Sequence, residues 1–248
     1  MVKALLVTSR VTFTPDNYDT LVIGLAQHPD IGGLLILDNS SRDLTLKGLA
    51  LAGLGASGMG MNLLLNQYGL SHTRRLRAFE DAGKPVWILT TVNSPEALAI
   101  IKNHGFELVI NARTRCIYKK AILDAPRLGC INIHHGLLPL QRGTSCDMWN
   151  LSEGKATGFS IHCMAEKIDD GPILTVVQVD DGSERNYTAY LKRGAGLELQ
   201  EIKNVLTRLN QDENSIRGQP NISHPELKHR KTPNWRDIRA IRRSGFSL

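Results

Sequence analysis

Residues 86–110, VWILTTVNSPEALAIIKNHGFELVI, contain the pattern that decides the fold class. Residues 86–90 and 108–110 are short runs rich in Val, Ile and Leu, as in strands that are buried on both faces of a sheet. Between them Ser94 precedes Pro95, which is the usual order of a helix cap and the first helical residue. The stretch therefore predicts a strand, a helix and a second strand.

The same alternation extends over the first two-thirds of the chain. Further apolar runs that predict strands are residues 4–8, 33–37 and 130–133, each separated from the next by helix-compatible sequence. Strands of this kind, spaced by helices, indicate an α/β protein with a doubly wound, mostly parallel, Rossmann-like sheet.

The pattern changes after Gly158. It predicts two strands, residues 159–164 and 173–179, joined by an acidic turn at residues 166–171. A long amphipathic helix (186–209), a loop (211–225) and a short basic helix (233–244) are predicted to follow. We therefore expect an α/β domain over residues 1–210 and a basic C-terminal extension over residues 211–248.

Composition is that of an ordinary globular protein, with 42% hydrophobic and 22% charged residues. The net charge of +6 is concentrated in residues 215–248, which contain eight Lys or Arg and two acidic residues, so 8 − 2 = +6. Two interpretations of this basic tail stay open: contact with phosphate on a nucleotide or RNA, or a solvated helix with surplus arginine. The four cysteines have no metal-like spacing and are expected to be free thiols.

Residues 48–65 carry no charge over eighteen positions, which is the lower limit for a membrane-spanning helix. Five glycines and Asn62 interrupt the run, which favours a buried or lid-like helix, and a cytoplasmic protein is expected. The run also contains Gly53, Gly55 and Gly58 in the spacing GxGxxG. A dinucleotide site requires a strand before these glycines, but residues 44–52 are helical in character, so the match does not indicate nucleotide binding.

The stretch CINIHHGLLPLQRG, residues 130–143, carries the chemistry. Asn132 and His134 are two residues apart on a predicted strand, so their side chains lie on one face near its carboxyl end. An amide can stabilise the oxyanion of a tetrahedral intermediate while an imidazole moves a proton. The spacing alone fits acyl transfer and a purely structural strand end equally.

Residues 121–143 resemble the formyltransferase family, which includes methionyl-tRNA, glycinamide ribonucleotide and sugar-nucleotide formyltransferases. That family has Asn-x-His, then Ser-Leu-Leu-Pro, an Arg-Gly turn and a later Leu-Asp-x-Gly; here the last is Ile168-Asp169-Asp170-Gly171. The resemblance covers about residues 105–180. It implies a formyl donor, 10-formyltetrahydrofolate, no metal, and three catalytic residues: Asn132, His134 and Asp169.

The resemblance also selects among neighbouring residues. Asp170 and His135 lie one position beyond the matched Asp and His, and are expected to be a turn residue and a structural or peripheral residue. Gly136 replaces the family's Ser, which removes a hydroxyl near the position of the acceptor. By position, the pterin ring of the donor would contact Arg115, Cys116 and Ile117, with the backbone of Glu166 and Lys167.

The resemblance implies a primary amine as acceptor. Residues 8–14 lack the Gly-Ser-Asn loop of glycinamide ribonucleotide enzymes, and residues 210–248 are too few for the C-terminal barrel of methionyl-tRNA enzymes. A small amine or amino-sugar nucleotide is therefore preferred over tRNA. Two alternatives stay open: a formylfolate hydrolase, and a folate-binding or regulatory relative with little turnover.

Overall fold

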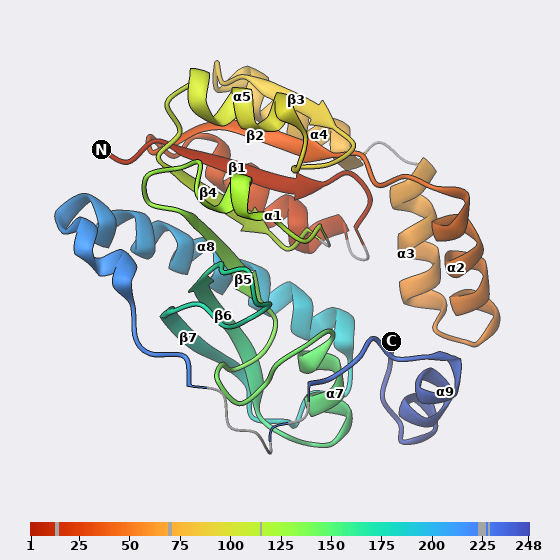
Figure 1. Cartoon of the computed structure of the whole chain (residues 1–248). Coiled ribbons are helices and arrows are strands. Elements are labelled where there is room, and N and C mark those ends of the chain that lie inside the picture. The colour runs from red at the N-terminus through yellow and green to blue at the C-terminus, as the bar shows by residue number, and fades with distance from the viewer. Residues whose placement is uncertain (13–14, 69–70, 115, 223–226, 228) are drawn as a thin grey trace.

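A seven-stranded sheet forms the centre of the computed structural model, which describes all residues except 13–14, 69–70, 115, 223–226 and 228 (Figure 1). The strand order is β3-β2-β1-β4-β5-β6-β7. The first five strands pair in parallel, and β6 and β7 are antiparallel. The strands are β1 (Ala4–Ser9), β2 (Ile31–Leu37), β3 (Val86–Leu89), β4 (Leu108–Ala112), β5 (Cys130–His134), β6 (Thr157–Cys163) and β7 (Ile173–Asp180). The predicted mostly parallel α/β sheet is confirmed.

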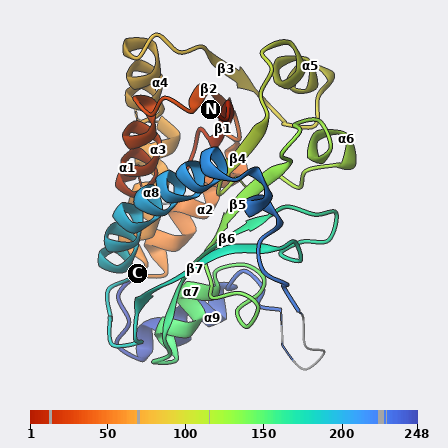
Figure 2. The same ribbon diagram turned by 90° about the vertical axis from the view of Figure 1, so that its left-hand side faces the viewer.

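Helices cover both faces of this sheet (Figures 1 and 2). On one face, Leu21 and Leu206 belong to a buried cluster formed by α1 (Pro15–Ala26), α4 (Ser71–Asp81) and α8 (Tyr187–Gln211). On the other face, Ile101 and Ile122 belong to a second cluster, formed with α5 (Pro95–Asn103) and α6 (Lys120–Leu123). Burial on both faces explains why the parallel strands are continuous apolar runs.

Three helices begin at capping side chains, and that of Ser94 was expected from the sequence. The side chain of Ser94 accepts from the backbone N–H of Ala97 at the start of α5, with Pro95 in the first turn. Asn186 caps α8 by accepting from Ala189. Asn234 caps the short basic helix α9 (Trp235–Arg243). Each cap satisfies backbone donors that the first helical turn leaves without a partner.

The prediction of one helix over residues 48–65 was wrong. The segment contributes to two helices, α2 (Arg42–Gly53) and α3 (Ser57–Tyr68), which form a hairpin beyond the end of the sheet (Figure 1). Gly55 has φ +80°, a backbone conformation that ends the first helix. A Cβ at Gly60 would lie 2.6 Å from the backbone oxygen of Gly48, so the small residues permit close helix packing. The GxGxxG glycines thus lie at a helix–helix turn.

No helix in the described part of the chain is long and apolar enough to cross a membrane. All four cysteines are free thiols, as expected.

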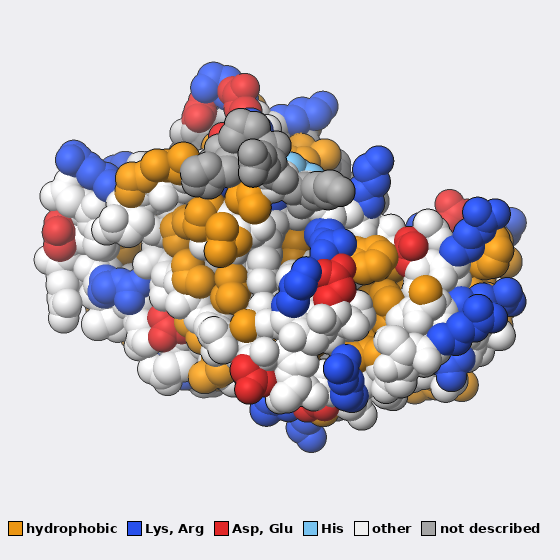
Figure 3. Space-filling model, turned by 90° about the horizontal axis from the view of Figure 1, so that it is seen from below, with side chains coloured by type: hydrophobic (Ala, Val, Ile, Leu, Met, Phe, Trp, Pro, Cys, Tyr) orange, Lys and Arg blue, Asp and Glu red, His pale blue; other side chains and the backbone are white. Residues whose placement is uncertain are grey.

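The C-terminal residues pack against the rest of the protein. Ile238 and Ile241 of α9, together with Phe246, join a third buried cluster with residues of α3, α7 (Cys146–Ser152) and α8. Upstream, the backbone of Arg230 bonds to Arg142 and Thr144. Between α8 and this segment lies the 3-10 helix η1 (Glu213–Arg217). Lys and Arg side chains gather over the α9 region of the lower face (Figure 3). The predicted boundary at residue 210 stays a prediction.

Candidate active site

The structure brings Asn132, His134 and Asp169 together. Asn132 and His134 lie on β5, and Asp169 lies in the loop between β6 and β7. Nδ1 of His134 is 3.5 Å from Oδ1 of Asp169, and the two side chains are 6% and 8% exposed. Their position at the carboxyl end of a parallel strand is where open α/β sheets bind ligands.

The loop that carries Asp169 is held from several sides. The carbonyl oxygen of Asp169 accepts hydrogen bonds from the buried guanidinium of Arg142 and from the amide of Asn221, at 2.5 and 3.0 Å. Asp169 has φ 54°, a left-handed conformation that Asp adopts more readily than most residues. A Cβ at Gly171 would lie 1.9 Å from the carbonyl oxygen of Cys163, so only glycine fits. These contacts direct the Asp169 carboxylate toward His134.

The hydrogen bonds of His134 determine which ring nitrogen is basic. Nε2 lies 2.7 Å from the carbonyl oxygen of Gln141, which only accepts, so Nε2 carries the proton. Nδ1 then holds the lone pair beside Asp169. Burial lowers the pKa of His134, and the attraction of Asp169 opposes this effect. His134 is therefore neutral near pH 7, and a proton accepted at Nδ1 would face the carboxylate.

A chain of hydrogen bonds orients the amide of Asn132. Its Oδ1 accepts from Nδ2 of Asn111 at 3.0 Å, and its Nδ2 lies 3.2 Å from Nε2 of His162. Nδ1 of His162 donates to the carbonyl of Cys163, so Nε2 is the accepting nitrogen. Burial and the nearby His134 lower the pKa of His162, which keeps its ring neutral. One N–H of the Asn132 amide has no other described partner and is available to an oxyanion.

These side chains lie on the wall of a cavity of about 720 Å³. Of the residues expected at the pterin ring, Cys116, Ile117 and Glu166 line this cavity, and Arg115 lies outside the described residues. Lys167 is not on the wall; its ammonium pairs with Asp170 at 3.2 Å. Further apolar wall residues are Met164, Ala165 and Ile168. These residues make one part of a largely polar wall apolar.

His135 has a defined role in the structure. Its Nδ1 and Nε2 bond to the carboxylates of Asp147 and Glu198 at 2.8 and 2.9 Å, and Glu198 also pairs with Arg113. Tyr187 donates its hydroxyl to Asp147. Burial and Arg113 act to lower the pKa of His135, but the two carboxylates outweigh them and the net pKa is raised. His135 is therefore an imidazolium between two buried carboxylates. Asp170, in turn, pairs with Arg142 and Lys167 rather than His134.

Gly136 occupies a position with no room for a side chain. A Cβ there would lie 2.7 Å from Nε2 of His134 and 2.6 Å from the carbonyl oxygen of Gln141, which are the two atoms of the His134 hydrogen bond. Glycine in place of the family's serine at position 136 thus occurs where the chain passes close to the hydrogen bond of His134.

We expect Gly136→Ser to lower the rate of the reaction at this site by on the order of 10²-fold, because displacing His134 by about 1 Å misaligns its basic nitrogen. Steady-state kinetics measures the effect, and Gly196→Ser is the control, because Gly196 is exposed and a Cβ there meets nothing within 4 Å. An active Gly136→Ser enzyme would show that the site adapts to the side chain.

Several residues of this site are not among those predicted from the sequence. Asn111 pairs with Asn132 across β4 and β5, and its position directly after the apolar run 108–110 is a signal that the sequence contains. His162 pairs with Asn132 only through the antiparallel register of β6, which the sequence does not reveal. His229, Lys231 and Thr232 line the cavity from a distant part of the chain.

Comparison with known proteins identifies the family. The family model described as formyl transferase matches residues 76–206, more than half of the 248 residues. Methionyl-tRNA formyltransferase of Geobacillus thermodenitrificans is 41% identical over 98 residues, which cover 39% of this chain and 31% of that protein. The corresponding protein of Lysinibacillus sphaericus is 32% identical over 155 residues, 59% of this chain and 50% of that protein. The matched regions thus span half or less of these relatives.

Solved structures share the fold at lower identity. A phosphoribosylglycinamide formyltransferase from Streptococcus pneumoniae superposes with a TM-score of 0.58 at 17% identity, covering 85% of this chain and 99% of that one. A sugar N-formyltransferase from Shewanella sp. superposes with a TM-score of 0.57 at 18% identity, covering 98% and 87%. With the family model matched over more than half of its length, the chain belongs to the formyl transferase family.

Proposed function

We propose that this protein transfers a formyl group from 10-formyltetrahydrofolate to a primary amine, with Asn132, His134 and Asp169 as the catalytic residues. The observation that carries the proposal is the placement of neutral His134, its Nδ1 lone pair beside the Asp169 carboxylate, on the wall of the 720 Å³ cavity. The methionyl-tRNA, phosphoribosylglycinamide and sugar formyltransferases to which the chain is similar support the same reaction class.

Each residue has one role in this proposal. The amine nitrogen forms a bond to the formyl carbon, and the negative charge that develops on the formyl oxygen is stabilised by the amide N–H of Asn132. Nδ1 of His134 takes the proton that the amine loses, and Asp169 stabilises the resulting imidazolium. The bond from the formyl carbon to the folate nitrogen then breaks, and that nitrogen receives the proton. Atoms and charge balance without another reactant.

The donor site is proposed to include Cys116, Ile117 and Met164, whose side chains line the cavity. Thermal unfolding with a stable 10-formylfolate analogue tests this part of the proposal. A ligand that binds only the folded state contributes RT ln(1 + [L]/Kd), about 2.7 kcal/mol at 100 times Kd, so the melting temperature should rise by several degrees. NAD is the control and should leave it unchanged. An unchanged melting temperature with the analogue at high concentration would reject the donor site.

A further inference from the structure

A second, smaller cavity of about 340 Å³ lies next to the catalytic one. Its volume is within the range of about 300–1,000 Å³ that is typical of small-molecule sites. The walls come from α2, α3, α7, α8 and α9, and their side chains are mostly apolar: Leu51, Leu54, Met59, Met148, Leu191 and Ile238. The reaction described above assigns no role to this cavity.

The two cavities share part of their walls. Arg113, His135, Ser145 and Thr232 line both of them. His135 directly follows His134 in the chain, so the shared wall lies beside the catalytic histidine. A molecule whose amine lies near His134 therefore has this second cavity within reach of its other end.

The charged groups of the shared wall are already neutralised. Arg113 pairs with Glu198, and His135 bonds to both Glu198 and Asp147. Asp147 and Glu198 are nearly fully buried, with side chains 1% and 2% exposed, so these pairs are shielded from water. A phosphate at this wall would lose its hydration and gain no uncompensated cation from Arg113 or His135.

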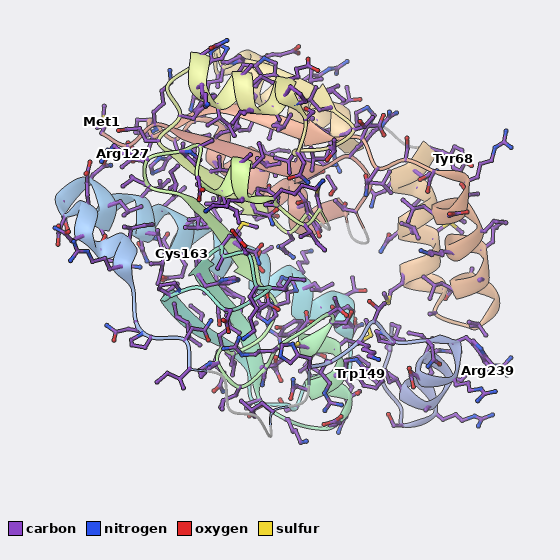
Figure 4. The ribbon with its side chains drawn as sticks, in the orientation of Figure 1. Met1, Tyr68, Arg127, Trp149, Cys163 and Arg239 are labelled. Atoms are coloured by element: carbon purple, nitrogen blue, oxygen red, sulfur yellow. The ribbon has the colours of Figure 1, made fainter. Side chains whose placement is uncertain are left out.

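The arginines of α9 lie outside the cavity. Arg236 and Arg239 contact the ring of Trp235, at 5.1 and 5.4 Å from its centroid, and neither lines the cavity. Arg239 points away from the body of the protein, whereas Trp149 on α7 faces the segment that leads into α9 (Figure 4). The side chain of Asn234 is occupied by the cap of α9. Most of the wall is thus apolar; Lys47, an exposed residue of α2, adds a cation at the cavity, and further basic side chains lie around α9.

We infer that the acceptor carries an uncharged, apolar group that fills this second cavity while its amine lies beside His134 and Asn132. This inference rests on the proposed formyl transfer and narrows its substrate class. It favours an amine with an apolar substituent over the amino-sugar nucleotide that the sequence alone favours. Burial of a side chain such as that of leucine should then contribute to binding and catalysis.

Three α-amino amides test the inference: glycinamide, leucinamide and phosphoserinamide. They share the same reacting group, and an α-amino group with a pKa near about 8 is partly unprotonated at neutral pH. We expect kcat/KM for formyl transfer to be roughly 10- to 100-fold higher for leucinamide than for glycinamide. This ratio corresponds to the free energy gained when one apolar side chain is buried. Phosphoserinamide should be the poorest of the three.

A matched pair of variants on α2 locates the effect. Ala50 is exposed and lines the cavity, so Ala50→Trp should fill it and bring the ratio of leucinamide to glycinamide close to one. Leu49 is 56% exposed and does not line it, so Leu49→Trp should leave the ratio unchanged. A ratio near one in the wild-type protein, a ratio unaffected by Ala50→Trp, or a preference for phosphoserinamide would overturn the inference.

Failure of the proposed function gives a different result. If none of the three amides is formylated, formyl transfer to this class of amine is rejected, and ligand-observed NMR with leucinamide and glycinamide still tests the cavity. Tighter binding of leucinamide, lost in Ala50→Trp and kept in Leu49→Trp, supports the apolar site. Equal binding of the two amides rejects it.

Discussion

Replacing His134 with glutamine is expected to lower kcat for formyl transfer by about 10²- to 10⁴-fold, the usual contribution of a positioned general base. A glutamine amide can still donate to the carbonyl of Gln141, as Nε2 of His134 does, but it has no basic nitrogen facing Asp169. Rapid measurement of tetrahydrofolate release with and without an amine gives the rate of transfer. The melting temperature should change little, because the buried hydrogen bond is kept.

His104→Gln is the matched control, because His104 is exposed at the end of α5 and does not line the cavity. It should keep the wild-type kcat. If His134→Gln also keeps a near-normal kcat, His134 is not the base. Asp169→Asn should lower kcat as well, since the imidazolium then lacks its carboxylate.

Replacing His135 with alanine should have the largest effect on stability, a loss of about 3–5 kcal/mol in the free energy of unfolding. The substitution leaves Asp147 and Glu198 without the cation between them, and both side chains are almost fully buried. Such a loss is a large share of the total stability of a typical domain, about 5–15 kcal/mol. Urea unfolding measures it, with exposed His104→Ala as the control. A loss below about 1 kcal/mol would contradict the imidazolium assignment.

The pH dependence of His135 follows from the direction of its pKa shift. The pKa is raised above the ordinary value of about 6.5, so its stabilising contribution is fully present below about pH 6.5 and is lost as pH rises through the folded-state pKa. The adjacent His134 has a lowered pKa. In an NMR titration, the ring signals of the two neighbouring histidines should therefore move on opposite sides of pH 6.5.

Most of the sheet could be predicted from the sequence because parallel strands buried on both faces are continuous apolar runs. The five predicted runs differ from β1 to β5 by no more than two residues at either end, and the predicted cap Ser94 marks the start of α5 correctly. The error at residues 48–65 has a physical cause: apolar periodicity does not register a turn at Gly55, where only the backbone angle changes.

The candidate site was predictable where it depends on local spacing and on the family resemblance. Asn132 and His134 share a strand face, and the structure brings Asp169 to His134. Asp147 on α7 and Glu198 on α8 could not be predicted, because they lie 12 and 63 residues beyond His135 in the chain. They meet His135 only in the folded protein. The same holds for Thr232, which reaches both cavities through pairing of Arg230 with Arg142.

Formyl transfer by this protein can be observed directly by following the formyl carbon. The protein is mixed with 10-formyltetrahydrofolate labelled with ¹³C in the formyl group and with leucinamide, and the products are read by NMR. We expect a labelled formamide of leucinamide in equal amount to the tetrahydrofolate released, and almost none with His134→Gln. Labelled formate alone would mean that water is the acceptor, and label that stays on the folate would contradict the claim that this chain transfers formyl groups.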